Sequence, residues 1–178
     1  MSMYGVEPER LTVPVSKHDH IRGRIDAPMT LVEYGDYECP YCSAACPLTE
    51  ALIDTLGDDL CFTYRHFPMV TMHPHAGRAA EAAEAAGAQK RFWEMHAMLF
   101  QNQDALEDED LVRYAASLQL SMKRFTEDLS TNAYAGKVRD NFRSGIQSGV
   151  NGTPSFFVNG VRYDGPRDLE SMIAALNQ

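Results

Sequence analysis

Two cysteines separated by two residues stand where a β-rich run gives way to a helical pattern. The run 30–35 predicts a strand, and beyond the second cysteine apolar residues recur at helical spacing until Gly57. Cys39-Pro40-Tyr41-Cys42 therefore lies at a predicted helix N-terminus, where unpaired backbone N–H groups and the helix dipole stabilise an anion such as a thiolate. Pro40 suits the first helical position because its missing N–H would have no partner there.

The spacing of this pair permits a redox-active disulfide. In a helix, Cα atoms at i and i+3 lie about 5 Å apart, inside the range of about 4.4–6.8 Å that disulfides use. A lowered pKa makes a cysteine a better-populated nucleophile and a better leaving group. We predict that Cys39 attacks, and that Cys42, one turn further into the helix, resolves the mixed disulfide.

Two further cysteines receive no redox role. Cys46 follows Cys42 by four residues and would lie more than about 10 Å along the helix axis from Cys39, so it could compete only for Cys42. We interpret it as a small helical residue. Cys61 falls on a predicted core strand and is interpreted as a buried, inert thiol. The roles of both stay open.

A metal or iron–sulfur module built on Cys39, Cys42 and Cys46 is the competing hypothesis, because such sites also use C-x-x-C. A four-cysteine cluster would need Cys61, from the middle of a strand, as its last ligand. None of the six histidines shows paired ligand spacing with a cysteine. We therefore predict no metal site.

The remaining pattern predicts a layered α/β domain. Residues 60–67 form a second predicted strand, residues from about 75 to 150 are nearly all helical, and 154–163 form a hairpin around Asn159-Gly160. A helix over 166–176 closes the chain. Strand–helix–strand implies a parallel pair with a right-handed crossover, and the hairpin adds antiparallel strands. We expect one domain over residues 1–178, with a mixed central sheet and an all-helical insertion at about 75–150.

Charge and hydropathy exclude some partners. The formal net charge is −9, and the 16 Lys and Arg residues are scattered, whereas nucleic-acid binding needs clustered positive charge. No segment approaches the roughly 18 apolar residues of a membrane span, and the first twenty residues lack a secretory-signal pattern. We expect no nucleic-acid partner and no membrane span. A cytoplasmic location is favoured, and a periplasmic or exported one stays open if a leader has been removed.

These residues together resemble the DsbA-like branch of the thioredoxin superfamily. The match rests on the strand–C-x-x-C–helix unit over 30–56, the long helical insertion, and Gly152-Thr153-Pro154 at the start of the hairpin strand. Residues 65–68 and 92–94 also fit the pattern, and the resemblance covers about residues 26–176. It implies a thioredoxin fold and a protein-disulfide oxidoreductase, with no cofactor other than the redox-active Cys39–Cys42 disulfide.

The resemblance also implies roles for individual residues. The Thr153–Pro154 bond would be cis and would pack opposite the cysteine pair, and Thr153 would offer its backbone to an extended substrate beside Pro40 and Tyr41. Glu33 lies six residues before Cys39, and strand alternation points it inward with Leu31. Thioredoxin-like proteins keep an acid at this offset, which implies that Glu33 takes the proton from Cys42.

One feature departs from the family pattern. The dipeptide Pro40-Tyr41 matches the common glutaredoxin pair, which leaves the redox potential and the direction of electron flow open. We expect protein or small thiol substrates, an unidentified redox partner and a monomer. A glutathione-dependent transferase or isomerase is a third hypothesis, but such relatives typically carry a single serine or cysteine in place of the pair. His73-Pro74-His75 is interpreted as a capping turn before a helix, and Trp93 as insertion core.

Overall fold

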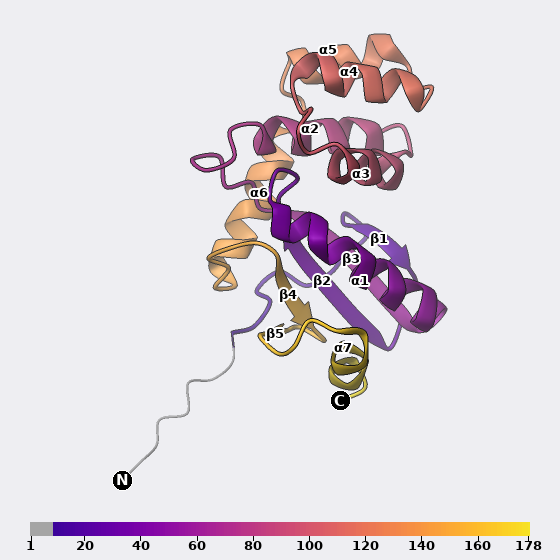
Figure 1. Cartoon of the computed structure of the whole chain (residues 1–178), viewed down its shortest axis with the longest axis vertical. Helices are drawn as coiled ribbons and strands as arrows, with labels where there is room; N and C mark the ends of the chain where they lie inside the picture. The colour runs from indigo at the N-terminus through magenta and orange to yellow at the C-terminus, as the bar shows by residue number, and fades with distance from the viewer. Residues whose placement is uncertain (1–8) are drawn as a thin grey trace.

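A five-stranded mixed sheet forms the centre of the protein in the computed structural model, which describes residues 9–178 (Figure 1). Residues 1–8 of the predicted domain lie outside the described residues. The strand order is β1-β3-β2-β4-β5, with β2 parallel to β3 and the other neighbours antiparallel. The strands are β1 (His20–Gly23), β2 (Met29–Gly35), β3 (Leu60–His66), β4 (Ser155–Val158) and β5 (Val161–Tyr163).

The predicted mixed sheet is confirmed, and one strand was missed. β1 is a four-residue edge strand paired antiparallel to β3, and so short a segment carries no readable alternation. The predicted hairpin is present as β4 and β5, with Asn159 at φ 48° and Gly160 at φ 80°. Positive φ at both central residues is what a type I′ turn requires, and asparagine and glycine tolerate it best.

Seven α-helices surround the sheet in the described part of the chain. α1 (Pro40–Leu56) and α7 (Leu169–Leu176) pack on one face, and α6 (Ala135–Gln147) packs against the other. The four remaining helices form a group beyond the end of the sheet from which α1 starts (Figure 1). They are α2 (Ala76–Gly87), α3 (Phe92–Gln101), α4 (Asp108–Ser117) and α5 (Met122–Ser130). Within residues 9–178, no helix combines the length and the apolar character needed to cross a membrane.

Side-chain alternation along β2 divides the core of the sheet into two layers. Leu31 packs with Leu52 and Met172 on the face covered by α1 and α7. Val32 and Tyr34 pack on the opposite face, beneath α6. The alternation places Glu33 on the same face as Leu31, as predicted, and this carboxyl group is buried.

A buried acid fixes the helical group to the sheet. Glu84 lies in the alanine-rich helix α2, and its side chain is 3% exposed. It pairs with His66 on β3 at 2.8 Å, His20 on β1 at 3.0 Å and Lys137 on α6 at 2.9 Å. A buried charge is tolerated only when it is paired. Glu84 therefore holds α2 and α6 in one position relative to the two strands.

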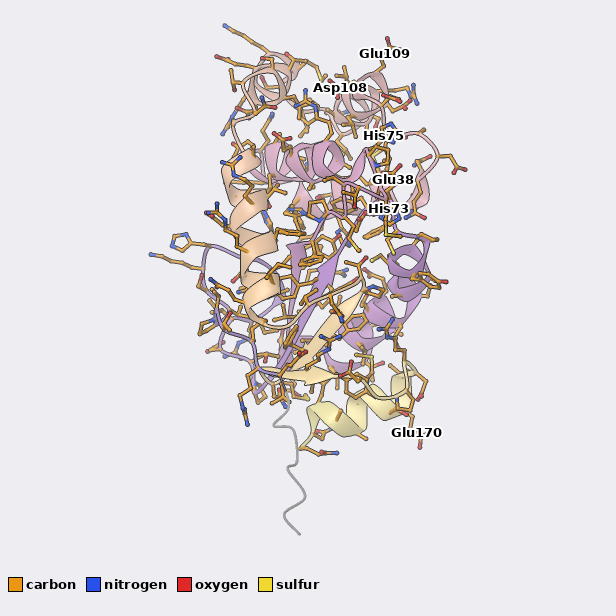
Figure 2. All side chains as sticks on the ribbon, turned by 90° about the vertical axis from the view of Figure 1, so that its left-hand side faces the viewer. Glu38, His73, His75, Asp108, Glu109 and Glu170 are labelled. Atoms are coloured by element: carbon orange, nitrogen blue, oxygen red, sulfur yellow. The ribbon has the colours of Figure 1, made fainter. Side chains whose placement is uncertain are left out.

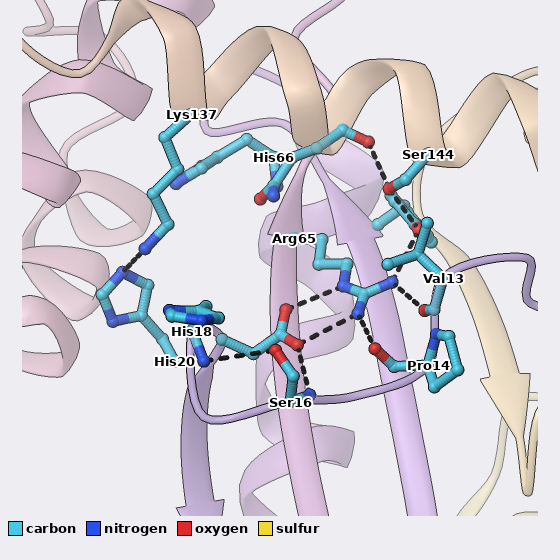
Figure 3. Close-up of polar contacts among 12 residues, drawn as sticks. Val13, Pro14, Ser16, His18, His20, Arg65, His66, Lys137 and Ser144 are labelled. Carbon is cyan, nitrogen blue, oxygen red and sulfur yellow. Dashed lines mark hydrogen bonds and ion pairs between the residues drawn. The ribbon is translucent and has the colours of Figure 1, made fainter.

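A buried arginine anchors the segment that precedes β1 (Figure 3). Arg65 on β3 is 2% exposed and donates to both carboxylate oxygens of Asp19, at 2.8 and 3.0 Å. It also donates to the carbonyl oxygens of Val13 and Pro14, at 2.7 and 3.1 Å, and to the Tyr34 hydroxyl at 3.1 Å. The planar guanidinium satisfies all of these acceptors at once.

Arg65→Lys should therefore destabilise the protein strongly. An ammonium cannot make the paired contacts of a guanidinium, and each buried acceptor left without a donor costs about 1–3 kcal/mol. Urea unfolding measures this loss. The matched control is Arg24→Lys, which alters the exposed Arg24–Asp26 pair and should cost less than about 1 kcal/mol. Equal effects of the two substitutions would contradict the anchoring role of Arg65.

Candidate active site

The cysteine pair lies at the N-terminus of α1, at the boundary between the sheet and the helical group. Cys39 is the N-cap residue, with an extended backbone, and its carbonyl oxygen accepts from the N–H groups of Cys42 and Ser43 at 3.2 Å each. Both cysteine side chains pack within the core cluster of the helical group. Tyr41, between them, is 72% exposed. The structure thus places the pair where the sequence predicted, with an open surface beside it.

The two thiols differ sharply in acidity. A hydrogen bond from the Cys42 thiol is the main cause that lowers the pKa of Cys39 to about 5, with further help from Thr153 and from the backbone N–H groups at the start of α1. The same hydrogen bond raises the pKa of Cys42, and burial and the nearby Glu33 raise it further. At neutral pH Cys39 is a thiolate and Cys42 keeps its proton. This asymmetry separates a nucleophile from a proton-bearing partner.

Glu33 lies behind this pair in a buried position. Burial raises the pKa of its carboxyl group to about 8, the negative charge of Cys39 raises it, and the Arg167 guanidinium partly opposes the rise. Arg167, just before α7, donates to the Pro154 carbonyl oxygen at 3.0 Å. A carboxyl group whose pKa lies near neutrality can both accept and release a proton. The sequence indicated Glu33 but gave no signal for Arg167.

The segment that precedes β4 lies against Cys39. The Thr153–Pro154 peptide bond is cis, as the family resemblance implied, and the Cys39 thiol approaches the Thr153 carbonyl oxygen at 3.5 Å. The structure thus brings together Cys39, Cys42, Thr153 and Pro154, with Glu33 behind them. Whether each of these residues acts in catalysis stays a prediction.

Two further site residues, Gln103 and Asp36, were not found from the sequence. Gln103, in the loop after α3, donates to the carbonyl oxygens of Tyr37 and Cys39, both at 2.9 Å. Asp36 accepts from the Nδ1 of His73 at 2.8 Å. Each contact joins segments that are distant in the sequence, so no local pattern could predict it.

His73-Pro74-His75 precedes α2 as the predicted capping turn, but its histidine rings make contacts that the prediction did not include. His75 stands at the N-cap position of α2 but makes no side-chain cap hydrogen bond to that helix. Its ring binds Glu38 through Nδ1 at 2.8 Å and Glu107 through Nε2 at 3.0 Å. Figure 2 shows His73, His75 and Glu38 gathered on one side of the molecule, where the helical group meets the sheet. Both histidines are therefore held by carboxylates.

Cys46 and Cys61 differ from Cys39 in that the pKa of each thiol is raised. The Cys46 thiol donates to the Cys42 carbonyl oxygen at 3.5 Å, and burial raises its pKa to about 12. Burial also raises the pKa of Cys61. Neither thiol forms an appreciable thiolate at neutral pH. Among residues 9–178, no group of three or more His, Cys, Asp or Glu side chains is arranged to hold a metal ion.

The fold and this arrangement define a class of protein. A mixed sheet, a cysteine pair at the N-terminus of the first long helix, a cis-proline beside it and a helical group between β3 and β4 make a DsbA-like thioredoxin fold. The chain belongs to the thioredoxin family, since the family model described as thioredoxin matches residues 15–178.

Solved structures share this fold. A thioredoxin-like oxidoreductase from Silicibacter pomeroyi superposes with a TM-score of 0.80 at 24% identity, covering 91% of this chain and 92% of that one. BdbD from Bacillus subtilis gives a TM-score of 0.78 at 24% identity over 96% and 98% of the two chains. The thiol-disulfide exchange protein α-DsbA2 from Wolbachia pipientis gives 0.80 at 18% identity over 90% and 87%.

Curated relatives are closer in sequence but much longer. The protein named Na⁺/H⁺ antiporter NhaA 3 from Salinispora tropica is 46% identical over 168 residues, which are 93% of this chain and 26% of that protein. Na⁺/H⁺ antiporter NhaA 1 from Mycobacterium sp. strain KMS is 45% identical over 96% of this chain and 28% of its own length. The chain thus spans about a quarter of the length of the curated relatives it matches.

Glu33→Gln should stabilise the protein in a pH-dependent way. The folded pKa of about 8 lies above the ordinary glutamate value of 4.5, so the folded state keeps a proton that the unfolded state releases. Stability therefore falls as pH rises between these values. The free energy of unfolding of the variant should exceed that of the wild type by on the order of 3 kcal/mol at pH 7. At pH 4 the two should be equal. Urea unfolding at several pH values measures this, with the exposed Glu109→Gln as control. Parallel pH profiles of variant and wild type would contradict a buried, protonated Glu33.

Proposed function

We propose that this protein is an enzyme, a thiol–disulfide oxidoreductase that exchanges disulfides with protein substrates through Cys39 and Cys42. The observation that carries the proposal is the asymmetry of the pair. A thiolate at the N-terminus of α1 lies beside a protonated thiol of much higher pKa. Structural cysteines need no such difference, whereas disulfide exchange requires one attacking and one resolving thiol.

The exchange follows from the geometry. In the oxidised protein, a substrate thiolate attacks the Cys39 sulfur, the Cys39–Cys42 bond breaks, and Cys42 leaves and takes a proton. The second substrate thiolate then attacks the substrate sulfur of the mixed disulfide and releases Cys39 as a thiolate. The substrate loses two electrons and gains a disulfide, and the protein gains both electrons. Glu33, behind the pair, is the group that we propose exchanges the Cys42 proton.

The acidity of Cys39 favours electron flow from the substrate to the protein. A pKa of about 5 stabilises the reduced protein as its thiolate, and a stabilised reduced form makes the disulfide a stronger oxidant. We therefore propose a disulfide donor, which needs a redox partner that takes two electrons from Cys39 and Cys42. Such a donor fits an oxidising compartment, in contrast to the cytoplasmic location that the sequence favoured.

The surface beside the pair suits a protein substrate. Tyr41, inside the C-x-x-C segment, is 72% exposed, and Met72, in the loop after β3, is 67% exposed. The cavity of about 930 Å³ between α1 and α3 is lined by Ser43, Cys46 and Trp93 but by neither Cys39 nor Cys42. We propose that an extended peptide lies across Pro40, Tyr41 and the Thr153 backbone, and that the protein acts as a monomer.

The antiporter relatives give context for the proposal. The chain matches about a quarter of their length, and their name describes the whole of those longer proteins. We propose that the shared quarter carries the thiol chemistry, since the cysteine pair and its surroundings lie within it.

The test is the reduction potential of the Cys39–Cys42 couple. Purified protein is equilibrated in glutathione buffers of graded ratio, quenched with acid, alkylated, and its thiols are counted by mass. We expect a reversible two-electron couple that Cys39→Ser abolishes and that Cys46→Ser preserves. Cys42→Ser should accumulate a mixed disulfide on Cys39. A protein without a reversible couple, or one whose couple depends on Cys46, would overturn the proposed function.

A further inference from the structure

Asp36 is a buried carboxylate next to the reactive thiol. Its side chain is 0% exposed, and its backbone carbonyl oxygen accepts from the Cys39 N–H at 3.1 Å. Its Oδ1 accepts from the Glu38 N–H at 2.8 Å, and its Oδ2 accepts from the Met69 N–H at 2.9 Å. These contacts tie the loop after β2 to the loop after β3. Through its backbone carbonyl the same residue is joined to the reactive cysteine, three positions along the chain.

His73 supplies the opposite charge at this point. Its Nδ1 donates to Asp36 Oδ2 at 2.8 Å, and its side chain is 17% exposed. The groups that act on its ring are Asp36, Glu38 and Cys39. Burial alone would lower the pKa of His73, but the hydrogen bond and charge of Asp36 and the charges of Cys39 and Glu38 raise it above the ordinary value. The charged form of His73 is therefore favoured relative to that of an ordinary histidine.

We propose that His73, held in place by the buried carboxylate of Asp36, supplies the positive charge that stabilises the Cys39 thiolate in this protein. The C-x-x-C segment contributes no charged side chain of its own, because its central residues are Pro40 and Tyr41. The positive charge comes from His73, in the loop after β3. His73 is a positioning residue, and its role rests on the proposed function because it sets the acidity of the thiol in that reaction.

The interaction free energy between two titrating groups shifts the pKa values of both groups. If the Cys39 thiolate favours the cation of His73, then the cation of His73 favours the thiolate by the same free energy. Loss of the cation also leaves Asp36, three residues before Cys39, as an uncompensated buried negative charge, which is costly. Both effects act in the same direction, and both raise the pKa of Cys39 when the charge of His73 is removed.

His75 provides a matched control in the same loop. Its Nδ1 binds Glu38 at 2.8 Å and its Nε2 binds Glu107 at 3.0 Å, with 38% of the side chain exposed. The hydrogen bond with Glu38 is the largest cause that raises the pKa of His75, and Cys39 is not among the causes. The two histidines lie in the same loop and each binds a carboxylate through Nδ1, His73 that of Asp36 and His75 that of Glu38. The charge of Cys39 is a cause of the raised pKa of His73 and not of that of His75.

The experiment compares His73→Gln with His75→Gln. Glutamine keeps an N–H donor and removes the charge. The pH dependence of thiolate absorbance near 240 nm gives the pKa of Cys39, and glutathione equilibration gives the potential. We expect His73→Gln to raise the pKa by about half a unit or more and to shift the equilibrium about threefold toward the disulfide form, which is about 15 mV. His75→Gln should leave both quantities unchanged.

A second measurement needs no variant of the loop. Proton NMR titration of the imidazole groups is carried out on the wild-type protein in its dithiol and disulfide forms. The His73 midpoint should be higher in the dithiol form, where the thiolate is present, and the His75 midpoint should be the same in both. Equal His73 midpoints, or equal responses of the two Gln variants, would overturn the inference. A wild type with no reversible couple would instead overturn the proposed function.

Discussion

The parallel pairing of β2 and β3 is the constraint on which the site depends. Parallel strands end at the same edge of a sheet, so the loop after β2, which carries the cysteine pair, meets the loop after β3, which carries His73. Asp36 then joins the two loops through one buried carboxylate. The N-terminus of α1, the cis-proline and the helical group are all arranged around this junction.

The hydrogen bond between the two thiols, together with burial, separates the acidities of the groups at this junction. Cys39 sits at the helix terminus, where N–H groups and the Cys42 thiol lower its pKa. The same hydrogen bond raises the pKa of Cys42 and burial raises it further, while burial raises the pKa of Glu33. Three ionisable groups of ordinary chemistry thus become a thiolate, a protonated thiol and a carboxyl group that titrates near neutrality.

Buried ion pairs fix the positions of the helices and of the segment before β1 relative to the sheet. Glu84 binds two strands to two helices, and Arg65 binds the segment before β1 to the sheet. Such pairs add little net stability compared with apolar packing, but a structure that leaves one partner unpaired is strongly disfavoured. They therefore select one placement of the helical group over the sheet, and with it one position of the loop that carries His73.

The sequence by itself determined the features that depend on local pattern. Hydrophobic period and turn residues gave β2, α1, β3 and the hairpin, C-x-x-C gave the reactive pair, and strand alternation put Glu33 on the inward face. Only the tertiary structure decided the partners of His73, Gln103 and Arg167, and the short edge strand β1. The contact of Gln103 with Cys39 spans 64 residues and that of His73 with Asp36 spans 37. Contacts of this range depend on how the helical group packs against the sheet, and no local periodicity encodes that packing.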